Sequence, residues 1–530
     1  MHKFILKYSP DIAKAYRNAK YKILSPKIQN DILQAAAIAL VHEIKIELMD
    51  SYYSILADET RDSCSNELVA VCLRYLHKGD IHERAVGFVD GSSDLSAEGI
   101  SNSILLILEQ LELDPDKCVG FGFDGASVMS GNRGGVQAIL RRTYTRASYV
   151  HCHSHRLNLV LQHVATKDED LKVFFSLTNN LVTFYRYPKR NAILKRAQKR
   201  LRLGKQLVSL PRPIDIRWLS NALTVERIAI LFPSIIEALE ELEAIPDIQI
   251  QAQSLLHHLR SKKFIFILNT LSKILDAAKC CTKTLQSHSL ALDNAVGFIN
   301  GLRDLLIMYR SEEYFFEVFK LTDEIAFKFE ITAWDSRTER VRHVPQRFDD
   351  YFDCNIRYTK TVRSVEDLKI IWHDLYDNLL GEIDRRFSED SMSFFHCTHN
   401  ILNRNNYCES ELTQRFNIII PESEAIMFNA FSQRSLVETP TLLDLTSICD
   451  PNIFDNISTL LNILVVCPVT TVCVERLFST VNLIHSSHRA SMLTTRLCNL
   501  SLLSFETDIT KKLQETPLIV EKVMRKMVKK

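Results

Sequence analysis

The chain has 530 residues, 46% of them hydrophobic, and a formal net charge of +1. This length predicts about two to four domains with a sizeable core, and the balanced charge neither marks the whole chain as a nucleic-acid binder nor excludes a local basic patch. The 13 Cys show no regular paired spacing, and the sequence shows no signal peptide. Both observations favour a reduced intracellular setting over a disulfide framework. The longest apolar run, 460–474, is too short to span a bilayer, so we expect no membrane partner.

Residues 1–50 are lysine-rich and then helical in pattern, as ILQAAAIALVHEIKIEL shows. They predict a helical lead-in. No Cys precedes Cys64 and only His2 and His42 come before it, whereas a zinc finger needs four clustered ligands. We therefore expect no N-terminal zinc finger.

Three strand-like runs follow, YYSILADET, LVAVCLRYL and RAVGFVD, and Asp58 lies at the end of the first. An amphipathic helix is predicted over Ile100–Leu111, and CVGFGFDGASVMSG then returns to a strand, with Asp124 where the chain leaves the sheet. The order strand, strand, strand, helix, strand is that of an RNase H-like fold. We predict an α/β core with a mixed sheet, its first part over 51–227.

The segment YVHCHSHRLNLVLQHVA predicts a further strand followed by a helix, with Cys152 and His155 at the strand end. If that strand is parallel to its neighbour, both lie beside the acids. HCHSH packs four potential zinc ligands into five residues, but zinc normally needs a second pair, and no other Cys and His form one at short spacing. A buried Cys and a hydrogen-bonded core His are the remaining alternative.

The stretch RYPKRNAILKRAQKRLRLGK carries nine basic residues and no acid. It predicts contacts with DNA phosphates, although a solvated helix face or a nuclear import signal is also open. The candidate contacts are Lys189, Arg190, Lys195, Arg196, Lys199 and Arg200. Arg217 and Trp218 follow in DIRWLSN, where Arg217 could hold a phosphate and Trp218 could stack on an extruded base or pack in the core.

The rest of the chain divides into three segments. Residues 228–450 predict an all-helical domain, with helices in segments such as IFILNTLSKILDAAK and LKIIWHDLYDNLLGEIDRRF. In 451–510, Val474, Leu477, Val481 and Ile484 recur at helical spacing while Glu475 lies on another face. The final segment, 511–530, is a basic tail.

Five motifs in order, ADET, FDGASVMSG, HCHSHRLNL, RWLS and VERLFS, followed by MLTTRLCNLSLL, resemble those of hAT-superfamily transposases, including the zinc-finger MYM-type relatives. The segment DIRWLSN departs from the family at Asn221, where an Arg is often found. The resemblance implies an RNase H-like core interrupted by the helical domain, with dimerisation through the C-terminal region. It also implies that Glu475 is the last catalytic carboxylate, with Asp58 and Asp124 as its partners, and that Cys152 and His155 help to place DNA.

A triad of this type needs three carboxylates because two divalent ions, about 3.5–4 Å apart, must be held during strand cleavage. We expect Asp58, Asp124 and Glu475 to bind Mg²⁺ or Mn²⁺, with DNA and a second copy of the chain as partners, no small-molecule cofactor and a nuclear location. Taken singly, Asp58 and Asp124 are equally typical of turns and Glu475 of a helix surface. The alternative function is a catalytically silent, domesticated or truncated transposase that acts as a dimeric nuclear binding factor, which the missing finger favours. A bare RNase H-type nuclease would not explain the helical domain or the C-terminal helices.

Overall fold

The computed structural model describes residues 25–49, 51–62, 64–201, 207–211, 218–287, 290–336, 361–387, 393–403, 408–436, 440–485, 489 and 491–516. The chain folds into two compact units. Unit 1 comprises Met1–Cys152, His288–Asp293 and Met392–Lys530, and unit 2 comprises His153–Ser287 and Asn294–Ser391. The domain ranges expected from the sequence stay predictions. Among the described residues, no helix has both the length and the apolar character required to cross a membrane.

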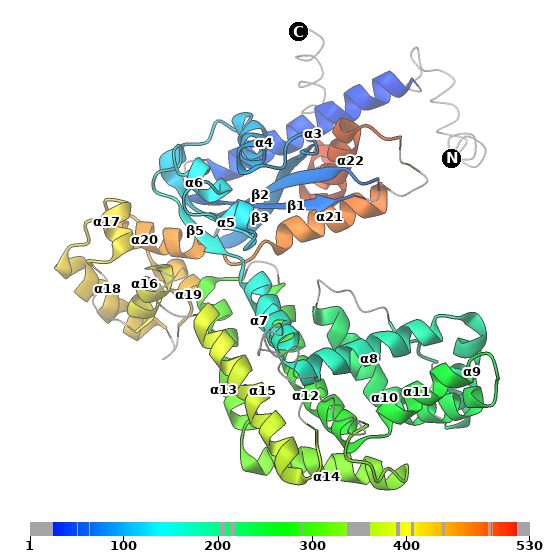
Figure 1. Ribbon diagram of the computed structural model, residues 1–530. Coiled ribbons are helices and arrows are strands. Elements are labelled where there is room, and N and C mark those ends of the chain that lie inside the picture. The colour runs from blue at the N-terminus through cyan, green and yellow to red at the C-terminus, as the bar shows by residue number, and fades with distance from the viewer. Residues whose placement is uncertain are drawn as a thin grey trace, which may run out of the picture. The chain divides into compact units, whose positions relative to one another are not determined.

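Unit 1 is built on a mixed sheet with the strand order β3-β2-β1-β4-β5 (Figure 1). Its strands are β1 (Tyr53–Arg61), β2 (Glu67–His77), β3 (Asp80–Asp90), β4 (Cys118–Phe123) and β5 (Ser148–His151). The pairs β1–β2 and β2–β3 are antiparallel, whereas β1–β4 and β4–β5 are parallel. Helix α4 (Ala97–Glu109) lies between β3 and β4 in the chain. The predicted α/β fold class and the order strand, strand, strand, helix, strand are confirmed.

Local sequence explains the antiparallel half of this sheet. Lys78 and Gly79 both have positive φ, 53° and 86°, which matches the mirror-type turn that a two-residue hairpin requires between β2 and β3. Consecutive residues of β2 from Leu68 to Tyr75 are buried, so both faces of the sheet are covered. Arg74 is the exception to an apolar strand, and it donates to Glu83 and to the carbonyl oxygens of Leu290 and Val465.

The core of unit 1 includes residues of α3 (Pro26–Leu48), α4, α5 (Ser127–Ser130), α6 (Val136–Leu140), α21 (Val472–Ile484), α22 (Thr494–Phe505) and α23 (Thr507–Glu515) together with the strands (Figure 1). Unit 1 also contains α16 (Ser393–Leu402), α17 (Glu411–Arg415), α18 (Glu422–Ser435), α19 (Leu442–Ile448) and α20 (Asp455–Val466). Leu40 of α3, Leu477 of α21 and Leu502 of α22 belong to one apolar cluster with the strands. The C-terminal helices therefore close the same core that the first strands begin.

The described part of unit 2 is helical. Its helices are α7 (His153–Lys167), α8 (Glu169–Tyr185), α9 (Pro188–Arg200), α10 (Trp218–Glu243), α11 (Gln249–Leu259), α12 (Lys262–Leu285), α13 (Leu292–Tyr309), α14 (Glu312–Lys328) and α15 (Val365–Arg386). The side chains of Ser261, Ser311 and Ser364 cap α12, α14 and α15 by accepting backbone N–H groups. The helices predicted for the middle of the chain are confirmed.

Two glycines of β4 admit the segment that leads into α21. Gly120 and Gly122 lie two residues apart and so share one face of the strand. A methyl group added to Gly120 would lie 2.7 Å from the Ser148 carbonyl oxygen and 3.1 Å from Pro468, and one added to Gly122 would lie 3.0 Å from Pro468. Pro468 therefore packs directly on β4, and the alternation of glycine in CVGFGF makes this approach possible.

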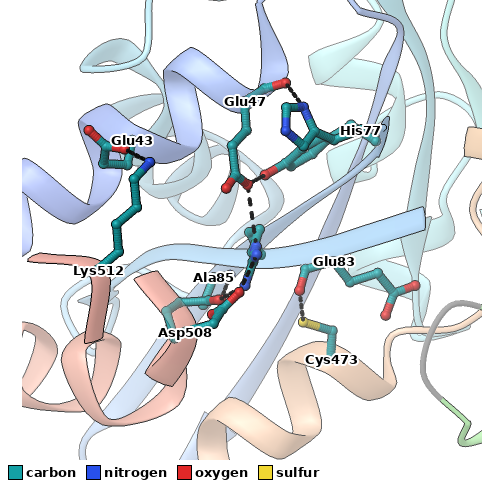
Figure 2. Close-up of polar contacts among 11 residues, drawn as sticks. Glu43, Glu47, His77, Glu83, Ala85, Cys473, Asp508 and Lys512 are labelled. Atoms are coloured by element: carbon teal, nitrogen blue, oxygen red, sulfur yellow. Dashed lines mark hydrogen bonds and ion pairs between the residues drawn. The ribbon is translucent and has the colours of Figure 1, made fainter. Parts of the chain in front are cut away.

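A buried arginine holds the C-terminal helices to β3 (Figure 2). Arg84 donates to Glu506 at 2.8 Å and to both oxygens of Asp508 at 2.8 and 2.6 Å, while the N–H of Ala85 donates to Glu506 at 2.7 Å. Burial alone would lower the pKa of Arg84, but Asp508 and Glu506 raise it above its ordinary value. The start of α23 is thus fixed to the strand by charge as well as by apolar packing.

The substitution Gly120→Ala should lower the free energy of unfolding by about 1–3 kcal/mol, because the added methyl group must displace a backbone carbonyl and a proline ring. Urea unfolding followed by circular dichroism measures the change. Gly134→Ala is the matched control in the same unit, since nothing lies within 4 Å of its added methyl group. Equal losses in the two variants would contradict the close packing of Pro468 on β4.

Candidate active site

Two acids lie on neighbouring parallel strands, although Asp58 lies within β1, which continues to Arg61, and not at the strand end as expected. Asp58 lies in β1 and Asp124 directly follows β4. Leu56 pairs with Gly122, so Asp58 and Asp124 lie two residues further along strands that are about 4.8 Å apart, on the same face. Asp124 also forms the turn, since its Oδ1 accepts the N–H of Ala126 at 3.1 Å. Turn formation and membership of a site are therefore compatible for this residue.

The third acid, Glu475, lies in the first turn of α21, and contacts with the sheet fix the start of this helix. The N–H of Thr471 donates to Cys152 Sγ at 3.3 Å, after β5, and Cys473 Sγ donates to the carbonyl oxygen of Glu83, in β3, at 3.5 Å. Together with Pro468 on β4, these contacts anchor α21 at three strands. The half-buried Glu475 is thereby held at a fixed position relative to β1 and β4.

The three acids lie close enough to influence one another. The pKa of Asp58 is raised to about 8, first by burial of its carboxyl group and then by the negative charges of Asp124 and Glu475. The N–H of Glu59, which donates to Asp58 Oδ1 at 2.9 Å, opposes the rise only in part. Because neighbouring charges act strongly only at short range, residues far apart in the sequence have been brought to one anionic site.

Glu59 is a fourth carboxylate that sequence reasoning missed. Burial and the charge of Asp124 raise the pKa of Glu59, with a further contribution from Glu67. Within the described part of the chain, its buried Oε2 has no hydrogen-bond partner. Successive residues of a strand point to opposite faces of the sheet, so the sequence alone does not suggest that Glu59 joins the same site as Asp58. The only sequence signal for Glu59 was its place next to Asp58 in the motif ADET.

His151 lies against the turn that follows Asp124. A Cβ added to Gly125 would lie 2.2 Å from His151 Cε1 and 2.5 Å from its Nε2, so the glycine after Asp124 makes room for the imidazole ring. His151 ends β5, which is parallel to β4. The sequence marked this residue only as part of HCHSH, and its neighbour across the sheet could not be inferred from spacing. In the described residues, HCHSH forms no group of three convergent metal ligands.

The predicted DNA-contacting pair of Cys152 and His155 is divided between the units. Cys152 is 1% exposed and supports α21 through its hydrogen bond with Thr471. His155 is partly buried in α7 of unit 2. A buried Cys agrees with the alternative considered for the motif, and contact of either residue with DNA stays a prediction. Arg217 lies outside the described residues, as does the side chain of Trp218 at the start of α10.

The basic segment forms α9 and meets acids that its own sequence lacks. Arg200 pairs with Glu237 and Glu241 of α10 at 2.5 and 2.9 Å, and Arg196 pairs with Glu241 at 2.6 Å. Arg190 lies over two rings, those of Phe184 and Tyr187. In the described structure, Lys189, Lys195 and Lys199 are exposed and form no ion pair. The positive charge that remains available on α9 is therefore mainly that of the three lysines.

Residues 3–135 match a family model described as ZMYM1/FAM200, RNase-like domain. Over these residues the chain is similar to the RNase-like domain of that family. The matched segment includes β1–β4, Asp58 and Asp124, and it ends before Glu475. The match supports the RNase-like fold that the sequence motifs imply for this part of the chain.

The donor set fits divalent cations that prefer oxygen ligands. All three acids offer carboxylate oxygens, and burial together with the charges of Asp124 and Glu475 raises the pKa of Asp58. Carboxylates of this kind hold pairs of divalent ions about 3.5–4 Å apart in two-metal sites. Asp58, Asp124 and Glu475 would hold these ions.

The substitution Asp58→Asn should stabilise the metal-free protein increasingly as the pH rises. The folded pKa of Asp58 is about 8, and the unfolded value is about 3.9. Between these two pKa values Asp58 is protonated in the folded state and ionised in the unfolded state. The free energy of unfolding of the wild type therefore falls as the pH rises through this range. The advantage of the variant should grow from about pH 5 to about pH 8, by at most about 1.4 kcal/mol per pH unit.

Urea unfolding in EDTA at the two pH values measures this difference. Asp94→Asn is the control, because hydrogen bonds from Ser96 lower the pKa of Asp94 and this exposed carboxyl is ionised throughout the window. The control should show no pH-dependent advantage. A constant difference between Asp58→Asn and the wild type would contradict the raised pKa.

Proposed function

We propose that the chain is a hAT-type DNA transposase or a protein derived from one, with an RNase H-like core that cleaves and transfers DNA strands. Asp58, Asp124 and Glu475 form its triad and hold two Mg²⁺ or Mn²⁺ ions. The observation that carries this proposal is the raised pKa of Asp58, to which the charges of Asp124 and Glu475 both contribute. The match of residues 3–135 to an RNase-like family supports it.

Each acid has a distinct role in this proposal. The charges of both other acids act on Asp58, which would therefore contact both ions. Asp124 would hold one ion and Glu475 the other. When bound, such ions activate the attacking oxygen and stabilise the leaving oxygen of a phosphodiester. The chain itself contributes a fixed ligand geometry, through the parallel pairing of β1 with β4 and the anchoring of α21.

DNA binding is proposed for α9, because its exposed lysines provide positive charge for phosphates. The full set of proposed contacts is Lys189, Arg190, Lys195, Arg196, Lys199, Arg200, Cys152, His155, Arg217 and Trp218. For Cys152, support of α21 is the more direct contribution to activity. A DNA substrate places the protein in the nucleus in this proposal.

Self-association through the C-terminal region is also proposed. Most apolar residues of α21 and α22 are buried within unit 1, so they close the core, which was the alternative explanation for this segment. Leu483, near the end of α21, and Leu493, before α22, remain 83% and 75% exposed. Exposed large apolar side chains close together in the chain favour an interface, and a second copy of the chain is the partner that the family resemblance implies.

A catalytically silent, domesticated or truncated relative that acts as a dimeric nuclear DNA- or protein-binding factor is the second candidate. The ion pairs of Arg196 and Arg200 with acids of α10 favour it, because they reduce the charge available for DNA. The intact set of three acids favours the enzyme. Cleavage and metal binding together distinguish the two.

With Mn²⁺ present, the wild type should nick a supercoiled plasmid and cleave a preformed DNA hairpin. Asp124→Asn and Glu475→Gln should each lower the cleavage rate at least about 100-fold, because each removes an ionic ligand for the ions. Gel electrophoresis of the DNA measures the rate, and Asp94→Asn is the control with an acid changed outside the triad. Thermal unfolding should show that the variants remain folded.

Mn²⁺ binding, followed by electron paramagnetic resonance, completes this experiment. Cleavage by Asp124→Asn at the wild-type rate would contradict the assignment of Asp124 to the triad. Absence of cleavage in the wild type, with a dimer intact in light scattering, would instead favour the silent binding factor. In that case, retained Mn²⁺ binding that Glu475→Gln weakens would still identify the metal site.

For the dimer, the double substitution Leu483→Glu and Leu493→Glu should raise the dissociation constant about tenfold or more, because charges would enter an apolar contact. Light scattering over a dilution series measures it. Ile250→Glu is the matched control, since Ile250 is 81% exposed in unit 2. An unchanged dimer in the double variant, or an equal effect of the control, would place the interface elsewhere.

A further inference from the structure

A buried His and a buried Asp meet a Cys where the turn after β1 reaches the end of α21. Asp62 and Cys64 lie in the turn, and His485 is the C-capping residue that follows α21. The side chains of Asp62 and His485 are each 1% exposed, whereas Cys64 is partly exposed. Cys64 Sγ lies 3.6 Å from His485 Nε2, and His485 Nδ1 lies 3.0 Å from Asp62 Oδ2.

The proton positions follow from the carboxylate. Burial alone would raise the pKa of Asp62, but hydrogen bonds from Asn66 and Cys64 and the proximity of His485 lower it below its ordinary value. An ionised carboxylate can only accept hydrogen bonds, so His485 Nδ1 carries a hydrogen and donates it to Asp62. In the neutral imidazole, the lone pair of Nε2 then lies on the side of the Cys64 thiol. A thiol, an oriented imidazole and a carboxylate in series form the arrangement that activates a cysteine nucleophile.

The same three groups could instead hold a metal ion, since their ligand atoms all lie within 4.8 Å of one another. However, the oxygens of Asp62 are already engaged. Oδ1 accepts the N–H groups of Cys64 and Asn66 at 2.8 Å each, and Oδ2 accepts the Asn66 amide and His485 at 3.0 Å each. Cys64 and His485 alone are fewer protein ligands than the three or four of a typical zinc site. The arrangement therefore favours the thiol and imidazole pair.

We propose that Cys64 is a nucleophilic thiol, activated by His485 and oriented through Asp62, and that it is a modification site for peroxides and other soft electrophiles. This site is separate from the three acids in composition and does not require that they bind metal. It does join the same two elements, since β1 carries Asp58 and α21 carries Glu475.

The reaction with hydrogen peroxide balances without a further reactant. His485 Nε2 takes the proton of the Cys64 thiol, and the thiolate attacks one peroxide oxygen. A sulfur–oxygen bond forms as the oxygen–oxygen bond breaks, so sulfur is oxidised by two electrons and the other oxygen leaves as hydroxide. Hydroxide takes the proton from the imidazolium to give water. The products are a sulfenic acid at Cys64, neutral His485 and water.

The test is competitive alkylation of the full chain by a limiting amount of iodoacetamide, with peptide mass spectrometry at near-neutral pH. Cys280 is the internal comparison because it is exposed in α12, whereas Cys64 is only partly exposed. Cys64 should nevertheless be alkylated faster. His485→Gln should slow alkylation of Cys64 about tenfold or more, since an ordinary thiol is only a few per cent thiolate near pH 7, and leave Cys280 unchanged.

Asp62→Asn should also slow Cys64, because it removes the acceptor that fixes the imidazole. Local unfolding in either variant would expose Cys64 and accelerate alkylation, so it cannot imitate the expected fall. Peroxide followed by dimedone should label the Cys64 peptide of the wild type before that of Cys280. Slower alkylation of Cys64 than of Cys280 in the wild type would overturn the proposal, and so would an increase at Cys64 on adding EDTA, which would indicate a bound metal.

Discussion

The charges of Asp124 and Glu475 repel the ionised carboxylate of Asp58. The rest of unit 1 must supply enough stabilising contacts to offset this repulsion. A carboxyl group whose pKa is raised to about 8 opposes folding at higher pH, since burial and like charges both disfavour its ionised form. The favourable terms lie around it. The strands β1 and β4 are paired, and α21 is fixed by Pro468 on β4 and by the Thr471 hydrogen bond to Cys152. Apolar packing thus holds the acids where electrostatics alone would separate them.

The elements that bear these acids could be predicted from sequence because their determinants are local. A strand of alternating glycine and phenylalanine, the Lys78–Gly79 turn and the helical spacing around Leu477 all act within a few residues. The position of Asp124, where the chain leaves β4, also follows from local pattern, whereas Asp58 lies within β1 and not at its end. Knowing the order of strands then suffices to bring Asp58 near Asp124. Glu475 required the resemblance to a known family.

What could not be predicted depends on contacts between distant segments. The basic helix α9 contains no acid, yet Glu237 and Glu241 of α10 neutralise part of its charge. His485 lies 423 residues from Asp62 in the sequence, and neither residue type in its local setting signals the other. His151 illustrates the same limit at short range, because its position against Gly125 follows from the parallel pairing of β4 and β5. Composition and spacing carry no information on such partners.

The electrostatic cost at the triad also bears on the choice between enzyme and silent scaffold. Amides at these positions would keep nearly the same shape and remove the repulsion, so a protein that used only the fold would gain stability from them. Among the described residues, the Asp58 carboxylate accepts a hydrogen bond only from the adjacent backbone N–H of Glu59, so hydrogen bonding within the fold does not account for an acid at this position. A cation between the carboxylates would convert repulsion into attraction and lower the pKa of Asp58. The unfavourable charge at Asp58, which a divalent ion would relieve, therefore supports the proposed metal-dependent function rather than the silent alternative.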